Sequence, residues 1–125
     1  MIWDVLSPLY DFFETIYNGK CFKGTAEEIK NHVGKDDVVL ECACGTGLLT
    51  LPMAQICKEI VATDYSDGML KQTQKKIAGY PNVTVQKASI LDIPFEDNKF
   101  DVVVAANVIH LLDEPEKALA EMKRV

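Results

Sequence analysis

Apolar and polar positions alternate along the chain in blocks that predict strands and helices in turn. Four blocks predict short strands, because each is either continuously apolar or alternates with a period of two; they lie at 38–41, 60–63, 83–87 and 100–106. Helices are expected in the blocks between and beside these strands, at about 25–33, 48–56, 67–78 and from 113 onward. This alternation predicts an α/β fold, with a Rossmann-like parallel sheet, flanking helices and right-handed crossovers.

Three of the expected helices carry capping signals at their first residues. Thr25 is followed three residues later by Glu28, as in a capping box. Ser66 is expected to be the N-cap of the helix that follows it. Asp113 and Glu116 form a similar pair for the last helix. We therefore expect a side-chain cap at each of these helix starts.

A further helical segment is predicted at residues 2–18, either as one helix or as a broken pair. Its aromatic side chains would lie against an apolar surface; they are Trp3, Tyr10, Phe12, Phe13 and Tyr17. Asn18 and Gly19 are expected to end the segment. The pattern thus places a helical unit ahead of the alternating part of the chain.

Composition and charge limit the classes of protein to consider. The chain has 125 residues, of which 48% are hydrophobic, so we expect one domain with a packed core. The net charge of −6 disfavours a nucleic-acid partner, which usually needs a basic face. No apolar run approaches the ~18 residues of a membrane helix, and residues 1–9 do not resemble a signal peptide. We therefore expect a cytoplasmic protein without a membrane span.

The cysteines do not form a metal-binding pattern. Cys42 and Cys44 are separated by one residue, and no second pair accompanies them. The other two cysteines are Cys21 and Cys57. We therefore expect free thiols in a reducing compartment and no metal site.

The main candidate for a binding site is the loop after the first strand. Glu41 ends this strand, and Gly45 and Gly47 permit a tight turn that a ligand can approach closely. Strand, small-residue turn and helix form the first half of a nucleotide-binding unit. The second strand ends at Asp64, whose carboxylate can accept hydrogen bonds from both hydroxyls of a ribose. We expect the ligand at the carboxyl ends of the strands.

Several motifs, taken in order, resemble the class I S-adenosylmethionine-dependent methyltransferases. The loop Glu41-x-Ala43-x-Gly45-x-Gly47 resembles the family's acid followed by alternating glycines, with Ala43 in place of the first glycine. Further segments match in the family's order, namely Asp64, 92–95, 97–101, 107–110 and 112–115. The resemblance covers about residues 37–125 and implies S-adenosyl-L-methionine as the cofactor.

The resemblance implies a set of cofactor-binding positions along the chain. Asp64 would bind the ribose, and Glu41 would help to bind the methionine end of the cofactor, directly or through water. Tyr65 and Met69 would line the adenine pocket. The full set consists of Glu41, Ala43, Cys44, Gly45, Gly47, Asp64, Tyr65, Met69, Ser89, Ile90 and Asn107.

The later residues of this set would contact the adenine and the sulfonium that carries the methyl group. Ser89 stands where the family often has an acid for the adenine amino group, and its hydroxyl can accept that hydrogen bond without charge assistance. Ile90 would cover the adenine ring, and Asn107 would face the sulfonium. His110 is a candidate general base, with a surface or helix-packing histidine as the alternative. Because transfer from a sulfonium depends mainly on alignment and exclusion of water, the catalytic residues stay undefined beyond these two candidates.

The resemblance also predicts which part of the fold the chain contains. The family's sheet normally has seven strands, whereas about four are predicted here. We expect an N-terminal helical segment at 1–34, acting as a lid or packed on the sheet, and an S-adenosylmethionine-binding domain at 35–125 without its C-terminal part. The fourth strand is too apolar for an exposed edge. We therefore expect either a fragment of a longer protein or an edge that self-association covers.

The sequence thus predicts an S-adenosylmethionine-dependent methyltransferase with a small-molecule acceptor, and two alternatives stay open. An NAD(P)-dependent oxidoreductase is disfavoured because Thr50 replaces its third small residue and Glu41 would repel a pyrophosphate. The second alternative is a truncated domain that binds a cofactor or a partner without turnover. Residues 106–109 lack an Asn-Pro-Pro-Tyr-like motif, which argues against methylation of nucleic-acid amino groups.

Overall fold

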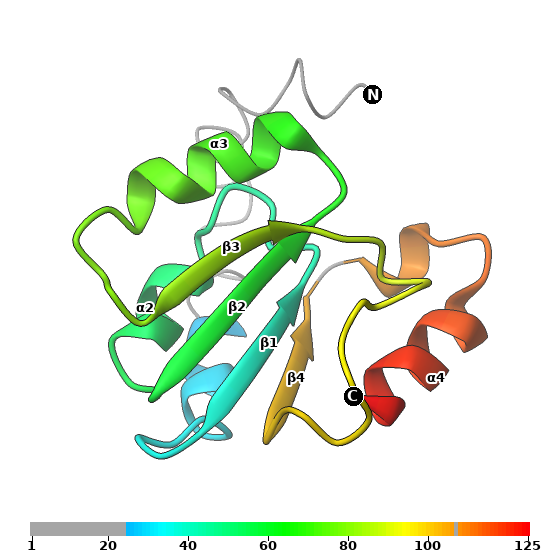
Figure 1. The fold of residues 1–125 in the computed structure, drawn as a ribbon, viewed down its shortest axis with the longest axis horizontal. Coiled ribbons are helices and arrows are strands. Elements are labelled where there is room, and N and C mark those ends of the chain that lie inside the picture. Colours follow the sequence, from blue (N-terminus) through cyan, green and yellow to red (C-terminus); the bar gives the residue numbers. More distant parts are fainter. Residues whose placement is uncertain (1–24, 107) are drawn as a thin grey trace.

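The computed structural model describes residues 25–106 and 108–125 of the chain. In this part, parallel strands form one sheet in the order β3-β2-β1-β4 (Figure 1). Their bounds are β1 (Val38–Cys42), β2 (Glu59–Asp64), β3 (Val83–Lys87) and β4 (Val102–Ala105). The predicted α/β class and parallel sheet are confirmed. The aromatic segment at 2–18 lies outside the described residues.

The central strand β1 explains why the sheet forms as it does. Val39, Leu40, Glu41 and Cys42 are all buried, as expected for a parallel strand with neighbours on both sides. β1 pairs with β2 and with β4, and Leu40 lies opposite a valine in each neighbour. This register brings the carboxyl ends of the strands to one edge of the sheet.

The described helices connect these strands in the predicted order. Residues 25–30 are helical and end three residues before the expected boundary at 33. The helical elements that follow are α2 (Thr50–Ala54), α3 (Asp67–Lys76), the short 3-10 helix η1 (Ile109–Leu111) and α4 (Pro115–Arg124). α2 is shorter than the predicted 48–56, because the chain from 45 to 49 forms turns before the helix begins.

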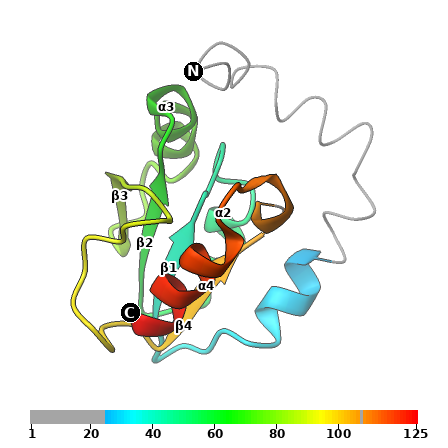
Figure 2. The same ribbon diagram turned by 90° about the vertical axis from the view of Figure 1, so that its right-hand side faces the viewer.

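The sheet lies between two hydrophobic layers. On one face, the helix at 25–30 and α2 pack against Val39 and Ile60. On the other face, Leu40 and Cys42 pack with Ile93 and Val125 from the β3–β4 connection and the end of α4. Figure 2 shows this connection and the helix at 25–30 on opposite sides of the sheet. The layers make the three-layer arrangement that a buried parallel sheet requires.

The capping predictions have different outcomes. Ser66 is confirmed as the N-cap of α3, since its hydroxyl accepts a 3.2 Å hydrogen bond from the Met69 N–H. The prediction for Asp113 is wrong: α4 begins after Glu114, whose side chain makes no capping hydrogen bond. Pro115 starts this helix at a position where an amide donor is not needed. The backbone of Glu114, with φ −125 and ψ 64, departs from ordinary N-cap geometry.

Two further expectations concern edges and membranes. Among the described residues, β4 is the last strand of the sheet and pairs with β1 alone; its residues are half-buried. Self-association through this strand stays a prediction. None of the described helices has the length and hydrophobicity that a bilayer crossing requires.

Cys42, Cys44 and Cys57 are free and buried, whereas Cys21 lies outside the described residues.

Candidate functional site

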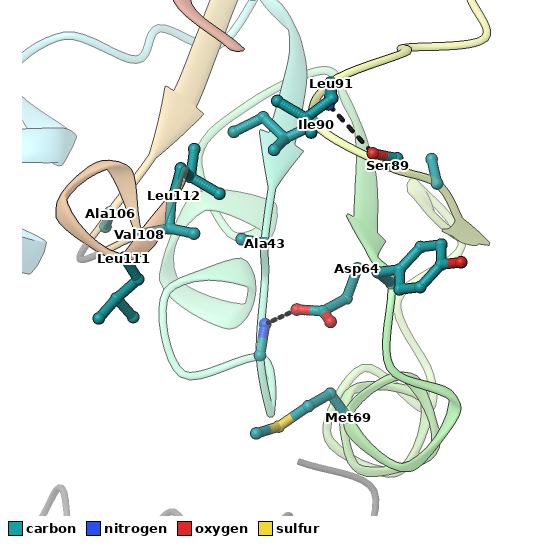
Figure 3. Close-up of a pocket in the computed structure, with 13 residues that line it drawn as sticks. Ala43, Asp64, Met69, Ser89, Ile90, Leu91, Ala106, Val108, Leu111 and Leu112 are labelled. Carbon is teal, nitrogen blue, oxygen red and sulfur yellow. Dashed lines mark hydrogen bonds between the residues drawn. The ribbon is translucent and has the colours of Figure 1, made fainter. Parts of the chain in front are cut away.

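A cavity of about 340 Å³ lies at the carboxyl ends of the strands, and this volume falls in the range of small-molecule sites. Figure 3 shows its lining side chains around the loop that follows β1. The structure brings many of the predicted cofactor residues to its wall, namely Ala43, Gly45, Asp64, Tyr65, Met69, Ser89 and Ile90. The expected location at the strand ends is therefore the location of this cavity.

Other predicted residues are placed differently. Glu41, Cys44 and Gly47 are buried and do not line the cavity. His110 lies in η1, is exposed, and is also absent from the wall. Asn107 lies outside the described residues. A direct contact of these five residues with a ligand stays a prediction.

The loop after β1 turns tightly because three alternate residues have left-handed backbones. Gly45 has a φ of 59° and Gly47 a φ of 88°, which glycine adopts without steric cost. Ala43 has a φ of 53°, so this alanine takes the conformation that a glycine would favour, at a cost of about 1–2 kcal/mol. The replacement at Ala43 therefore leaves the turn intact.

The two glycines serve the loop in different ways. A Cβ on Gly45 would meet no atom within 4 Å, so this position leaves space free beside the cavity. A Cβ on Gly47 would lie 3.1 Å from the Cα of Thr73 in α3. Gly47 thus permits close packing of the loop on α3. The Thr73 hydroxyl also donates a 2.8 Å hydrogen bond to the Gly45 carbonyl and lies 3.5 Å from the Cys44 sulfur.

Asp64 holds a carboxylate at the end of β2. Its Oδ2 accepts a 2.9 Å hydrogen bond from the Gly45 N–H, which Figure 3 shows as a dashed line. Its Oδ1 accepts a 2.9 Å hydrogen bond from the Ser66 N–H. A carboxylate has about four acceptor positions, so both oxygens keep capacity for a ligand. The geometry fixes this group against the glycine loop and the start of α3.

Glu41 is a buried acid behind the loop, with an exposed fraction of 3%. Its carboxyl accepts a hydrogen bond from the Thr50 hydroxyl at the start of α2. Burial raises the pKa of Glu41 to about 8; the Thr50 hydrogen bond lowers this pKa, and the negative charge of Asp64 raises it. Burial therefore favours the protonated, neutral form of Glu41. In the sequence, Thr50 was noted only because it replaces a small residue of the oxidoreductase pattern. Its hydrogen bond to Glu41 was not predicted.

The side of the cavity formed after β2 and β3 combines aromatic, thioether and hydroxyl groups. Tyr65 is 60% exposed, and the Lys87 ammonium lies 5.3 Å from its ring centroid. Met69 is buried and lines the cavity. The Ser89 hydroxyl accepts a 3.1 Å hydrogen bond from the Leu91 N–H and can still make further hydrogen bonds. The Tyr65 ring and the Met69 thioether thus give this side an apolar surface, and the Ser89 hydroxyl adds a polar group beside it.

The opposite side of the cavity is apolar, and sequence reasoning did not predict it. Val108, Leu111 and Leu112 lie there around η1, and Figure 3 shows them across the cavity from Asp64. Leu111 is 62% exposed and adds apolar surface to this side of the cavity. These apolar residues flank His110 in the sequence, and this clustering could have indicated an apolar wall beside that histidine. Ala88, Leu91 and Ala106 complete the wall.

A family model for a methyltransferase domain matches residues 40–125, which include the loop, Asp64 and every residue of the cavity wall. The chain belongs to the class I S-adenosylmethionine-dependent methyltransferase family. An oxidoreductase is not favoured by this match. Within the described ranges, no cluster of His, Cys, Asp and Glu side chains could hold a metal ion.

Known members of the family agree in sequence and in fold. Demethylmenaquinone methyltransferase of Renibacterium salmoninarum is 39% identical over 126 residues, which are 99% of this chain and 52% of that protein. A methyltransferase structure from Aquifex aeolicus has a TM-score of 0.70 and 29% identity, with coverage of 80% of this chain and 57% of its own. The chain spans about half the length of several curated relatives that it matches.

A more distant structure shows the same fold. Phosphoethanolamine N-methyltransferase 1 of Haemonchus contortus, solved with phosphoethanolamine and S-adenosylhomocysteine, has a TM-score of 0.81. Its identity is 17%, and the match covers 98% of this chain and 28% of that one. At this identity the likeness concerns the fold alone.

Proposed function

We propose that the chain binds S-adenosyl-L-methionine in the cavity at the strand ends, and that the whole protein transfers the methyl group to a small-molecule acceptor. The observation that carries this proposal is the Asp64 carboxylate, which lines the cavity and is fixed by the Gly45 and Ser66 amides. Family membership supports the identity of the cofactor.

Asp64 would bind the ribose of the cofactor. Each of its oxygens already accepts one backbone N–H and can accept a ribose hydroxyl as well. Hydrogen bonds to a charged group are worth about 1.5–3 kcal/mol each. Loss of two such bonds would lower the affinity by at least about 100-fold.

The remaining parts of the cofactor would lie on either side of the ribose. Tyr65 and Met69 would contact the adenine, with Ser89 near its amino group and Ile90 against its ring. The methionine end would lie over the loop, where Gly45 leaves space and Glu41 stands behind. The bound cofactor supplies an activated methyl group, and the protein aligns it and excludes water.

The acceptor is proposed to be a small apolar molecule of the demethylmenaquinone type. The apolar wall formed by Val108, Leu111 and Leu112 supports this choice, since it gives an apolar acceptor a surface opposite Asp64. The curated relatives named for demethylmenaquinone also support it. The test is transfer of a radiolabelled methyl group by the full-length protein to demethylmenaquinone, with phosphoethanolamine as the control. Transfer to phosphoethanolamine alone would reject the apolar acceptor, and binding without any transfer would favour the non-catalytic alternative.

Binding of the cofactor is tested by calorimetric titration with S-adenosylhomocysteine beside NAD. We expect binding of S-adenosylhomocysteine only, and at least about 100-fold weaker binding by Asp64→Ala. Asp36→Ala is the matched control, because this exposed acid lies in the turn before β1, at the end of the sheet opposite the cavity. Binding of NAD alone would refute the proposed cofactor. An unchanged dissociation constant for Asp64→Ala would refute the ribose contact.

A further inference from the structure

A network of hydrogen bonds joins the last turn of α4 to the connection between β3 and β4. Arg124 donates from Nε and Nη2 to the two carboxylate oxygens of Glu121, at 2.9 and 3.0 Å. Its Nη1 donates to the Phe95 carbonyl and to Asp97, both at 2.8 Å. Its Nη2 also donates to the Ile93 carbonyl at 2.7 Å. One guanidinium therefore holds three points of the connection.

Glu121 adds a second hydrogen bond to the backbone of Ile93. Its Oε2 accepts a 2.8 Å hydrogen bond from the Ile93 N–H, so the Arg124–Glu121 pair holds both backbone groups of this residue. The Arg124 hydrogen bonds and the Ile93 amide favour the charged carboxylate and lower the pKa of Glu121 from its ordinary 4.5 to about 2. The Ile93 side chain is 4% exposed and packs with Leu40 and Cys42 of β1.

The residues just before Ile93 form a wall of the cavity. Ser89 and Leu91 line it, and the turn between Ser89 and Asp92 is closed by a 3.2 Å hydrogen bond from the Asp92 N–H to the Ser89 carbonyl. The start of this turn is fixed by a 3.1 Å hydrogen bond from the Ala88 N–H to the Asp64 carbonyl. The turn is thus held at one end by β2 and at the other end by the Arg124–Glu121 pair.

We propose that Arg124 and Glu121 are positioning residues for the cofactor pocket: by fixing Ile93, they hold the turn at 89–91 in place against the adenine base. Neither side chain lines the cavity, so both act through the turn. The inference rests on the proposed function, because it assigns the adenine to this wall. Lysine cannot replace the arginine, since its single ammonium cannot reproduce the planar fork that serves Glu121, Asp97 and two carbonyls together.

The test compares two ligands that differ only in the base. S-Adenosylhomocysteine and S-inosylhomocysteine carry an amino group and an oxo group at the same ring position. The wild-type, full-length protein is expected to prefer the adenine form. In Arg124→Lys, affinity for S-adenosylhomocysteine should fall about tenfold, while affinity for the inosine form changes little, so the preference is lost.

A matched control separates positioning from general stability. Asn82→Ala removes two hydrogen bonds, to the Ala54 and Cys57 carbonyls at 2.8 and 3.3 Å, at the end of the sheet opposite the cavity. It should lower stability and leave the base preference unchanged. Glu121→Gln keeps the side-chain shape, loses the charge, and decides the question if Arg124→Lys does not fold.

The outcomes distinguish the two proposals. If the wild-type protein does not bind S-adenosylhomocysteine, the proposed function itself fails. If it binds both ligands equally, or if Arg124→Lys and Glu121→Gln keep the wild-type preference, the positioning role is refuted and the cofactor assignment stands. Loss of preference in these variants, with preference kept in Asn82→Ala, supports the positioning role.

Discussion

Replacement of Glu41 by glutamine tests the electrostatics behind the glycine loop. Glutamine keeps the shape of the side chain and can still accept the hydrogen bond from Thr50, but it does not ionise. The pKa of Glu41 is raised by burial from its ordinary 4.5 to about 8. Folding therefore favours the protonated acid. This stabilising contribution is complete below the unfolded-state pKa and is lost as the pH rises towards 8.

The size of the effect follows from the two pKa values. One pKa unit corresponds to about 1.4 kcal/mol. Between pH 5 and pH 7, the wild type should lose about 2.5 kcal/mol of unfolding free energy through Glu41, and Glu41→Gln should not. The difference between the two proteins isolates Glu41, because other titrating groups contribute to both.

The assay is urea unfolding of the cofactor-free protein at pH 5, 6, 7, 8 and 9, for the wild type and for Glu41→Gln. Parallel dependence of the unfolding free energy on pH in the two proteins would refute the reasoning. Thr50→Val provides a second check: it removes the donor that lowers the pKa of Glu41, so the loss of stability should continue to higher pH than in the wild type.

Four further substitutions test the glycine loop, a helix cap and the core, each by urea or thermal unfolding. Gly47→Ala should cost about 2–5 kcal/mol, because its Cβ would meet the Thr73 backbone in a left-handed conformation, whereas Gly45→Ala should cost about 1–2 kcal/mol and mainly weaken cofactor binding; equal losses of stability would contradict this. Ser66→Ala should cost about 1 kcal/mol through loss of the cap, and an unchanged melting temperature would exclude a stabilising cap. Met53→Ala should cost about 2–5 kcal/mol because this side chain is fully buried, and a smaller loss would mean that the core closes over the gap.

Local signals in the sequence were enough for much of the fold and part of the site. The strand at 38–42 is recognisable because a central parallel strand must be apolar on both faces. The position of Asp64 follows from the end of the next strand, and the turn between them follows from its glycines. Each of these features depends on residues that are neighbours in the chain.

The missed features depend on contacts between distant residues. Thr73 supports the Gly45 carbonyl from 28 positions away, and no periodicity in the sequence indicates this contact. The apolar wall includes the exposed side chain of Leu111, whereas a hydrophobic pattern predicts that a leucine is buried in a core. The capping error at Asp113 arose because Pro115 occupies the first helical position, which places the N-cap at Glu114, one residue later than expected.

The hydrogen bond from Arg124 to the Ile93 carbonyl can form only late in the synthesis of this part of the chain. These residues are 31 positions apart, so at about 5–20 residues per second the ribosome adds Arg124 roughly two to six seconds after Ile93. During this interval the nascent chain already contains the glycine loop, Asp64 and Ser89, but not the pair that fixes the turn at 89–91. We expect the turn at 89–91 to be fixed only after α4 has been synthesised, although α4 itself does not line the cavity.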